Sequence, residues 1–446
     1  MLSEIFKAYD VRGIYNENLT DDIAYNIGKA FVSFLGCKDV VVGYDMRVSS
    51  PKLSKAFMKG VIEAGADVID IGQVSTDGLY FASGSLKKAA VMFTASHNPP
   101  QYNGLKFCKA MAVPINEDTG LQQIKSIIEN NKYKKSGKAG KIVKKNILND
   151  YVEHVLSFIH KGKMNNLKIA VDAGNGMAGK VIPLVYDKLP IKIIPLYFKM
   201  DGTFPNHLAD PSKYENLKEL QRIVKKEKCD FGIAFDGDAD RIFFVDEDGE
   251  IVNSSLISAL LAKSVLEKHP NEKIIYNLVN SKIVPETIEK YGGKAHIERV
   301  GHSFIKDTMK RIHAIFACEH SAHYYFKHNF NADSGIIASL IVCEIISKEN
   351  KTLSELLKEF KVYSKIEETN FKVEDKAKKI QEIKEHYKGK NPKKIMTMDG
   401  ISIYFDDWWF NVRPSNTEPL LRLNLEADSK ELMEEKKDEV VRVIKG

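Results

Sequence analysis

A serine and two cationic side chains follow an apolar run in the segment TASHNPPQYNGLK at 94–106. Ser96 offers a hydroxyl that can act as a nucleophile or carry a phosphoryl group, and His97 and Lys106 offer positive charge. The run AAVMF at 89–93 predicts a buried strand, and open α/β sheets place their chemistry in the turns at such strand ends. The same residue types also suit an ordinary turn. Three further polar loops in similar positions favour chemistry over a plain turn.

The second loop carries three carboxylates at alternate positions, Asp236, Asp238 and Asp240, in the sequence GIAFDGDADR. Alternation in an extended segment points them the same way, and Gly237 lets the backbone curl so that they converge. Converging like charges need a cation, and an all-oxygen set suits Mg²⁺. The spacing also matches an EF-hand, with Glu247 at its twelfth position, but Arg241 stands where that loop needs glycine. An aspartyl-phosphate phosphatase loop, with Asp236 as the nucleophile, stays open.

The third loop, in AIFACEHSAHYYF, again follows a strand-like run. Glu319, Ser321 and His323 alternate, which suits hydrogen bonds to adjacent hydroxyls of a sugar. A metal site made of Glu319, His320 and His323 is the alternative, although no further histidine is spaced for a zinc-binding helix.

The fourth loop, in WWFNVRPSNTEPLLRLNLE, gathers cations and neutral donors between prolines that stiffen the turn. These side chains are Arg413, Ser415, Asn416, Thr417 and Arg422. Arginine forks bind phosphate oxygens in pairs, and hydroxyls fill the remaining lone pairs. The composition predicts a phosphate site, and a surface loop with incidental charge is the alternative.

One glycine motif competes with this assignment. Gly174, Gly176 and Gly179 spell GxGxxG after a strand-like run, as in dinucleotide-binding folds. The acidic residue that should end the next strand is missing, so the glycines are expected only to tighten a strand–helix junction.

Composition narrows the class of protein. A chain of 446 residues suits about three domains, and its net charge of +6 suits anionic small substrates but not nucleic acid. No apolar run is long enough to span a membrane, and MLSEIFKAYD lacks the apolar region of a signal peptide. The five cysteines are scattered without a CxxC, which favours reduced thiols and a cytoplasmic location.

Strand and helix signals alternate along most of the chain. Strands are expected at 39–44, 67–71 and 89–94 with helices between them, which makes a first α/β unit. Second and third units follow, and each delivers a polar loop from a strand end. After a charged helix near 372–388, strand-like segments and a final amphipathic helix at 429–444 predict a small α+β cap.

Taken together, TASHNP, DGDADR, EHSAH and RPSNTEPLLR resemble, in that order, the α-D-phosphohexomutase family across essentially the whole chain. FKAYDVRG at 6–13 and DGTFPNHLADPSKYENL at 201–217 are most similar to its phosphomannomutase/phosphoglucomutase branch. The resemblance implies three topologically similar mixed-sheet α/β domains and a smaller C-terminal α+β domain around a central cleft. The implied domains are 1–149 with a phosphoserine loop, 150–252 with a metal-binding loop, 253–364 with a sugar-binding loop and 365–446 with a phosphate-binding loop.

The resemblance also implies a role for each loop. Ser96 is then the phosphoserine, and Asp236, Asp238 and Asp240 hold Mg²⁺ with its oxygen. Sugar hydroxyls bind Glu319 and Ser321, and the phosphate that does not react binds Arg413, Ser415, Asn416, Thr417 and Arg422. The remaining residues around the cleft are Tyr9, Arg12, Lys106, Arg241, His302 and His323. Lys106 and His323 are both candidates for the general base.

The implied reaction interconverts hexose 1-phosphate and hexose 6-phosphate, of mannose, glucose or both, through a hexose 1,6-bisphosphate that also serves as activator. A phosphoglucosamine mutase, a Mg²⁺-dependent sugar phosphatase and a non-catalytic sugar-phosphate binding protein are the alternatives. Expected partners are small sugar phosphates, with no nucleic acid and no membrane, and the sequence leaves the oligomeric state open. Ala322 stands where the family often has glycine, and Asn280 and Lys282 are not expected to belong to the site.

Overall fold

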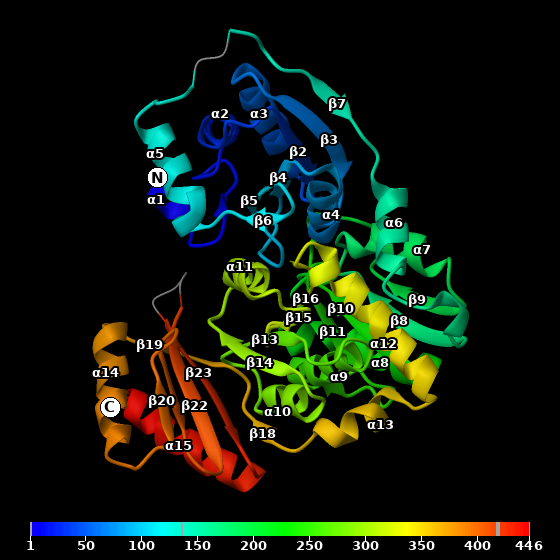
Figure 1. Cartoon of the computed structure of the whole chain (residues 1–446), viewed down its shortest axis with the longest axis vertical. Coiled ribbons are helices and arrows are strands. Elements are labelled where there is room, and N and C mark those ends of the chain that lie inside the picture. The colour runs from blue at the N-terminus through cyan, green and yellow to red at the C-terminus, as the bar shows by residue number, and fades with distance from the viewer. Residues whose placement is uncertain (1, 135–136, 416–419, 446) are drawn as a thin grey trace.

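The computed structural model describes residues 2–134, 137–415 and 420–445, and these residues form four sheets that follow one another along the chain (Figure 1). Helices surround the first three sheets, whereas the fourth belongs to a separate C-terminal cap, coloured orange to red in Figure 1. The predicted fold class, three similar α/β units and a smaller α+β unit, is confirmed.

The first sheet has the strand order β1-β5-β4-β2-β3-β7, with β6 paired to β5. Its strands are β1 Val11–Ile14, β2 Asp39–Tyr44, β3 Asp67–Gln73, β4 Ala89–Phe93, β5 Tyr102–Lys109, β6 Val113–Pro114 and β7 Ile142–Lys144. Its helices are α1 Leu2–Ile5, α2 Asp21–Leu35, α3 Ser50–Glu63, α4 Thr76–Leu86 and α5 Gln122–Glu129. Every residue of β4 is buried, as expected for a central strand with both faces covered.

The second sheet has the order β12-β11-β10-β8-β9. Its strands are β8 Leu167–Asp172, β9 Ile191–Leu196, β10 Phe231–Phe235, β11 Ile242–Val245 and β12 Ile251–Val252, and its helices are α6 Leu148–Leu156, α7 Ala178–Tyr186 and α8 Lys218–Glu227.

The third sheet has the order β14-β13-β15-β16-β17. Its strands are β13 Lys273–Asn277, β14 Lys294–Glu298, β15 Phe316–Cys318, β16 Tyr324–Phe326 and β17 Ala332–Asp333, and its helices are α9 Ser254–Lys268, α10 Ile283–Lys290, α11 His302–Ile312, α12 Gly335–Glu349 and α13 Leu353–Leu357.

The first three sheets share one topology. In each, three parallel strands lie in the order second, first, third, and the fourth strand pairs with the third in the antiparallel sense. A short turn therefore joins the third strand to the fourth in every unit, since antiparallel neighbours need no crossover. All three of these turns are polar loops singled out in the sequence.

The cap is an antiparallel sheet of order β18-β23-β22-β21-β20, with β19 paired to β23 and two helices packed against it. Its elements are β18 Ser364–Lys365, β19 Thr369–Lys372, α14 Lys376–Lys388, β20 Lys394–Met396, β21 Ile401–Tyr404, β22 Trp408–Pro414, β23 Leu420–Ala427 and α15 Lys430–Lys445.

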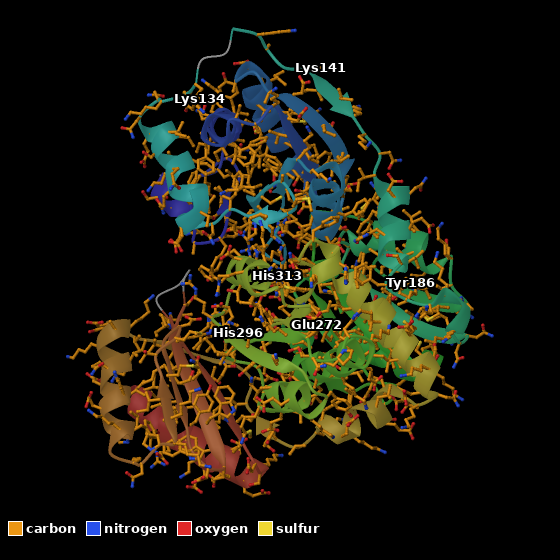
Figure 2. All side chains as sticks on the ribbon, in the orientation of Figure 1. Lys134, Lys141, Tyr186, Glu272, His296 and His313 are labelled. Carbon is orange, nitrogen blue, oxygen red and sulfur yellow. The ribbon has the colours of Figure 1, made fainter. Side chains whose placement is uncertain are left out.

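Hydrophobic packing separates the cap from the rest of the molecule. One continuous core contains Met92 of the first sheet, Ile169 of the second and Phe316 of the third. The cap has a core of its own, which includes Phe410 and Leu423. Side chains fill the space between the ribbons (Figure 2), where the Tyr186 hydroxyl of α7 donates a hydrogen bond to Ser339 of α12 at 2.7 Å.

All five cysteines are free thiols, as expected. Within the described residues, no helix combines the length and the apolar character that crossing a bilayer requires.

Candidate active site

The three turns between third and fourth strands converge at the junction of the first three sheets. They contain Ser96, the carboxylates at 236–240 and the segment 319–323. Each turn includes a non-glycine residue with left-handed backbone: Ser96 at φ 47°, Ala239 at φ 64° and Ala322 at φ 66°. The carboxylate residues therefore lie in a turn and not in the extended segment that the alternation suggested.

Ser96 and Asp236 form the contact between the first and second sheets. The Ser96 hydroxyl donates a hydrogen bond to Asp236 Oδ2 at 2.6 Å, and both residues are buried. Gly237 is needed here because of a close approach: a Cβ at this position would lie 2.4 Å from the Ser96 carbonyl oxygen. The chain thus brings the predicted carrier against the predicted metal ligands.

Lys106 of β5 lies between the other two carboxylates. Its ammonium group is 2.8 Å from Asp238 Oδ2 and 2.6 Å from Asp240 Oδ2, and Thr76 donates a further hydrogen bond to Asp238. Burial and the charge of Asp240 raise the pKa of Asp236 well above its usual range. Burial also opposes ionisation of Asp240, but Lys106 and His323 outweigh it and lower the pKa of Asp240 to about 2. We call Ser96, Lys106 and the three carboxylates the serine–carboxylate centre.

The three carboxylates fit a hard divalent cation. Each offers an oxygen, and these oxygens lie within 4.8 Å of one another in a buried position. Asp238 Oδ1 and Asp240 Oδ1 are buried and have no hydrogen-bond partner among the described residues. Buried polar atoms are normally satisfied, so unpaired carboxylate oxygens in one cluster indicate a place for a cation.

Two arginines flank the centre. Arg241 donates to Asp236 Oδ2 at 3.0 Å, and its Nη2 lies 3.5 Å from Ser96 Oγ. Arg12 of β1 donates to Asn98 Oδ1 at 2.5 Å and pairs with Asp10 at 2.6 Å. Arg241 therefore contacts Ser96 and its hydrogen-bond acceptor Asp236, and Arg12 contacts the serine turn through Asn98.

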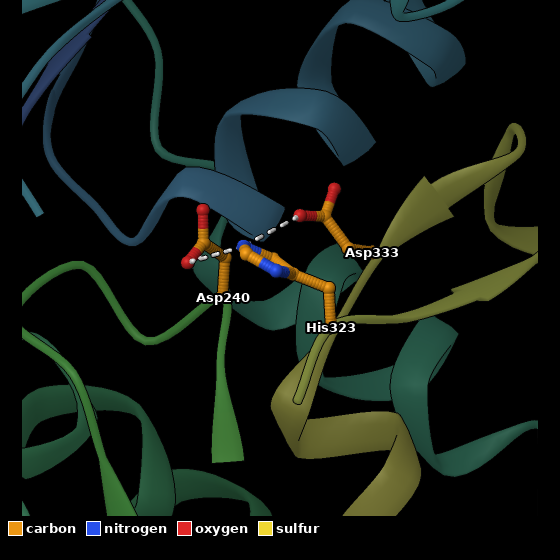
Figure 3. Close-up of side chains that lie close together, drawn as sticks. All are labelled: Asp240, His323 and Asp333. Carbon is orange, nitrogen blue, oxygen red and sulfur yellow. Dashed lines mark ion pairs between the residues drawn. The ribbon is translucent and has the colours of Figure 1, made fainter. Parts of the chain in front are cut away.

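His323 links the carboxylate turn to the third sheet (Figure 3). Its Nε2 is 3.7 Å from Asp240 Oδ1 and 3.9 Å from Asp333 Oδ2, and its Nδ1 is 2.9 Å from Ser321 Oγ. Asp333 in turn forms an ion pair with Lys306 at 2.6 Å. The imidazole is thus held between two buried carboxylates, an arrangement suited to accepting and returning a proton.

Glu319 is buried and already held by three donors. It accepts hydrogen bonds from Tyr325, from Asn277 at 3.2 Å and from the backbone of Gly301 at 3.2 Å. The alternative metal set of Glu319, His320 and His323 does not assemble, and the His320 ring instead lies 3.5 Å from the hydroxyls of Ser254 and Ser255.

Tyr9 and His302 meet where the first sheet's N-terminal segment contacts α11. Their rings pack edge to face at 5.7 Å, and the Tyr9 hydroxyl donates to the Val300 carbonyl at 3.3 Å. Burial, with the charges of Lys306 and Lys106, lowers the pKa of His302 to about 3, so this imidazole is neutral near pH 7.

In the cap, Arg413 and Arg422 are opposite residues on β22 and β23. Each lies 3.1 Å from Glu368, whose carboxylate also accepts from Asn424 at 3.0 Å. Ser415 Oγ lies 3.5 Å from Arg422 Nη2. Asn416 and Thr417 lie outside the described residues. The two guanidinium groups, hereafter the arginine pair, lie side by side as a phosphate site requires.

Sequence reasoning missed several residues that the tertiary structure brings to these sites. Thr76 begins α4 and reaches Asp238, Asp333 supports His323, and Glu368 pairs with both cap arginines. Each is a single polar residue within an unremarkable segment, so nothing local distinguished it. The segment DMRVSS after β2 did carry a signal, because polar residues crowd another strand end there.

The geometry does not support two alternatives that the sequence suggested. Glu247, which completed the EF-hand spacing, accepts hydrogen bonds from Ser354 instead. The glycines at 174–179 tighten packing, as expected: a Cβ on Gly176 would lie 2.7 Å from the Gly237 carbonyl oxygen, and one on Gly179 would lie 2.1 Å from that of Phe198.

Comparisons with known proteins cover the whole chain. Four family models match in order: Phosphoglucomutase/phosphomannomutase alpha/beta/alpha domain I at 3–135, domain II at 149–249 and domain III at 253–363, and the C-terminal domain at 368–443.

Individual relatives agree with those models. A phosphomannomutase from Methanocaldococcus jannaschii is 42% identical over 445 residues, covering 99% of this chain and 97% of the relative. A phosphomannomutase from Escherichia coli K12 is 38% identical, covering 95% and 94%. A crystal structure of a phosphoglucomutase/phosphomannomutase family protein from Burkholderia thailandensis superposes with a TM-score of 0.92 at 31% identity, covering 100% of this chain and 98% of the other.

Proposed function

The chain belongs to the phosphoglucomutase/phosphomannomutase family and is a phosphohexomutase, and from this premise we propose that phosphorylated Ser96 interconverts the 1- and 6-phosphates of mannose and glucose. One observation carries the proposal. The Ser96 hydroxyl lies 2.6 Å from Asp236 within a cluster of three carboxylates, a lysine and an arginine. A hydroxyl held among such groups is suited to exchanging a phosphoryl group, because positioning and charge stabilisation dominate that chemistry.

In the proposed cycle, phospho-Ser96 gives its phosphoryl group to the free hydroxyl of a bound hexose phosphate. The bond from phosphorus to Ser96 Oγ breaks as the bond to the sugar oxygen forms, and the product is a hexose 1,6-bisphosphate. The bisphosphate turns end for end, and its other phosphoryl group returns to Ser96. The sugar hydroxyl loses its proton to His323 in the first transfer, since Lys106 is held as an ammonium between Asp238 and Asp240 and has no lone pair to offer, and the departing Ser96 oxygen gains a proton.

The charged residues around Ser96 have distinct proposed roles. Asp236, Asp238 and Asp240 would hold Mg²⁺, which when bound offsets the negative charge of the transferring group. Arg241 lies 3.5 Å from Ser96 Oγ and Arg12 contacts Asn98 of the same turn, and both would orient the phosphoryl oxygens.

Substrate recognition is proposed to divide between two loops. Glu319 and Ser321 would bind sugar hydroxyls, with Tyr9 and His302 at the neighbouring wall. The arginine pair, with Ser415, Asn416 and Thr417, would bind whichever phosphate is not reacting. A site that receives either end of the bisphosphate must recognise phosphate and not a particular hexose carbon.

A product-resolved assay tests the proposal. The purified chain is incubated with Mg²⁺, a trace of glucose 1,6-bisphosphate and either mannose 1-phosphate, glucose 1-phosphate or glucosamine 1-phosphate, and each 6-phosphate and free phosphate are measured. We expect mannose 6-phosphate and glucose 6-phosphate to form faster than glucosamine 6-phosphate, with little free phosphate. Steady release of free phosphate would identify a phosphatase, and fastest turnover of glucosamine 1-phosphate would identify a phosphoglucosamine mutase.

A further inference from the structure

A buried arginine outside the predicted site holds the backbone of the serine turn. Arg47, in the loop between β2 and α3, directs its guanidinium at four carbonyl oxygens of the segment 96–102. Its Nη2 donates to Ser96 at 2.8 Å and Asn98 at 2.6 Å, and its Nη1 donates to Pro99 at 2.9 Å and Tyr102 at 3.0 Å. One side chain thus collects carbonyl groups that no helix or strand would satisfy.

The guanidinium is itself fixed from two directions. Arg47 is 1% exposed, and its Nε lies 3.3 Å from Asp45 Oδ2, so its charge is balanced within the first unit. From the second unit, the ring of Phe204 packs against the guanidinium with 5.1 Å between its carbon and the ring centroid. A Cβ on Gly202 would lie 2.6 Å from the Arg47 Cα, so the two units pack closely here.

The shape of this group matters as well as its charge. Guanidinium is a rigid planar fork with five N–H donors, whereas a lysine ammonium is a compact point charge on a flexible stem. Only the fork can reach four carbonyls on one side while its Nε faces a carboxylate on the other. Lysine at this position would keep the charge but lose most of the hydrogen bonds.

The hydrogen bonds act on the residue that would carry the phosphoryl group. Ser96 has left-handed backbone, which is unfavourable for a residue other than glycine and persists only where the surroundings hold it. Its own carbonyl is one of the four that Arg47 binds, and its hydroxyl must reach Asp236 from that conformation.

We propose that Arg47 is a positioning residue for phosphoryl transfer: it holds the 96–102 turn so that Ser96 Oγ stays against the carboxylates. Among the described residues, Arg47 forms no hydrogen bond or ion pair with the sugar-binding loop of the third unit or with the arginine pair. Its loss therefore slows transfer and leaves substrate affinity intact. This inference rests on the proposed function of Ser96.

Kinetics of the full-length chain with Arg47→Lys test the proposal. We expect kcat to fall about 100-fold, the usual effect of a small misplacement of a reacting group, with KM for the sugar phosphate within about twofold of the wild type. Arg222→Lys is the matched control, because Arg222 is exposed and pairs with Glu219 on its own helix, and it should leave both constants unchanged.

Chemical rescue separates positioning from a loss of folding. In Arg47→Ala, added guanidinium chloride, at a concentration that leaves the wild type unaffected, should restore part of kcat, and methylammonium chloride should not. A kcat of Arg47→Lys within threefold of the wild type, or a rise in KM with kcat preserved, would overturn the proposal.

If thermal unfolding shows that the Arg47 variants do not fold, the variant Phe204→Leu tests the proposal in their place. It keeps all four hydrogen bonds and removes only the ring that fixes the guanidinium, so kcat should fall several-fold with KM unchanged, and an unchanged kcat overturns the proposal. The wild type is assayed in parallel. A wild type without mutase activity would reject the proposed function itself, whereas an active wild type with unaffected variants rejects only the role of Arg47.

Discussion

The serine–carboxylate centre and the arginine pair of the cap hold their charged groups in opposite ways. In the centre, contacts cross from one sheet's unit to the next: Ser96 reaches Asp236 at 2.6 Å, and Thr76 reaches Asp238. In the cap, Arg413 and Arg422 are bound at 3.1 Å by Glu368, which belongs to the cap itself.

Hydrophobic packing also distinguishes the two regions. One hydrophobic core spans the first three units, beside a further core within the first unit, whereas the core of the cap contains cap residues alone. The cap meets the third unit through polar contacts such as the Lys282 N–H to Glu426 at 2.9 Å and the Val300 N–H to Asp399 at 3.3 Å. The comparison indicates that the proposed reacting groups are positioned by packing between units, while the proposed phosphate site lies in a body with a hydrophobic core of its own. Variants in the centre should therefore change kcat, and variants in the arginine pair should change KM.

The largest expected effect is the loss of the phosphoryl carrier. Ser96→Ala should lower kcat by at least about 10³-fold, because the phosphoryl group then has no oxygen to which it can transfer. Intact-mass spectrometry should show a phosphorylated fraction in the wild type and none in the variant. Ser85→Ala, at an exposed serine of α4, is the control and should retain full activity. Near-normal turnover in Ser96→Ala would favour Asp236 as the nucleophile.

Removal of the metal tests the same serine–carboxylate centre. Chelation should abolish turnover and Mg²⁺ should restore it, because three buried carboxylates otherwise repel the incoming phosphate. Asp238→Asn should lower kcat by about 10²-fold and weaken Mg²⁺ binding measured by titration calorimetry. Asp187→Asn, at an exposed position after α7, should change neither quantity. Turnover that is indifferent to chelator, or that requires zinc, would contradict the assignment.

In the cap, we expect a variant to change KM more than kcat. Arg413→Ala should raise KM about 10- to 100-fold for both 1-phosphate and 6-phosphate sugars, because one charged contact is lost whichever phosphate occupies the site. The kcat at saturating substrate should change much less. Arg442→Ala, at an exposed arginine of α15, serves as the control. A KM effect confined to one of the two sugar phosphates would show that the arginine pair recognises one end of the substrate only.

The smallest expected effect on catalysis comes from a variant that changes the stability of the three-unit body. Asp77 of α4 is fully buried and accepts hydrogen bonds from Tyr151 of the second unit and Ser334 of the third. Burial raises its pKa from 3.8 to about 6. Its protonated form is favoured on folding, so its contribution to stability is complete below pH 4 and is lost as pH rises toward 6. The gap between the two pKa values corresponds to roughly 3 kcal/mol.

The amide side chain of Asp77→Asn does not ionise, so this variant does not lose folding stability in the same way as the pH rises. Denaturant unfolding at several pH values between 4 and 7 should show its free energy of unfolding, relative to the wild type, rising by up to about 3 kcal/mol over this range. Kinetic constants per folded molecule should stay near those of the wild type. Parallel pH curves for the two proteins would show that Asp77 does not titrate in this window.

Much of this architecture was predictable from local pattern. The strands expected at 39–44, 67–71 and 89–94 are β2, β3 and β4, and the turn that contains Ser96 follows β4 as expected. The four polar loops stood out because charged and hydroxyl side chains interrupt apolar runs, and that contrast is visible in the letters alone. The alternation of the carboxylates was a weaker guide. Asp236, Asp238 and Asp240 converge through a turn with left-handed Ala239, a conformation that propensity does not predict for alanine.

The sequence by itself determined which side chains can do chemistry, on which strand ends they lie and to which family the motifs are similar. Tertiary structure alone decided their partners: Thr76 with Asp238, Asp333 with His323, Glu368 with both cap arginines and Arg47 with the serine turn. The physical reason is that most of these contacts join residues far apart in the chain, up to 162 positions for Thr76 and Asp238. Periodicity and propensity describe neighbours along the chain, whereas a buried hydrogen bond is selected by how whole sheets pack and by the cost of leaving either group unpaired.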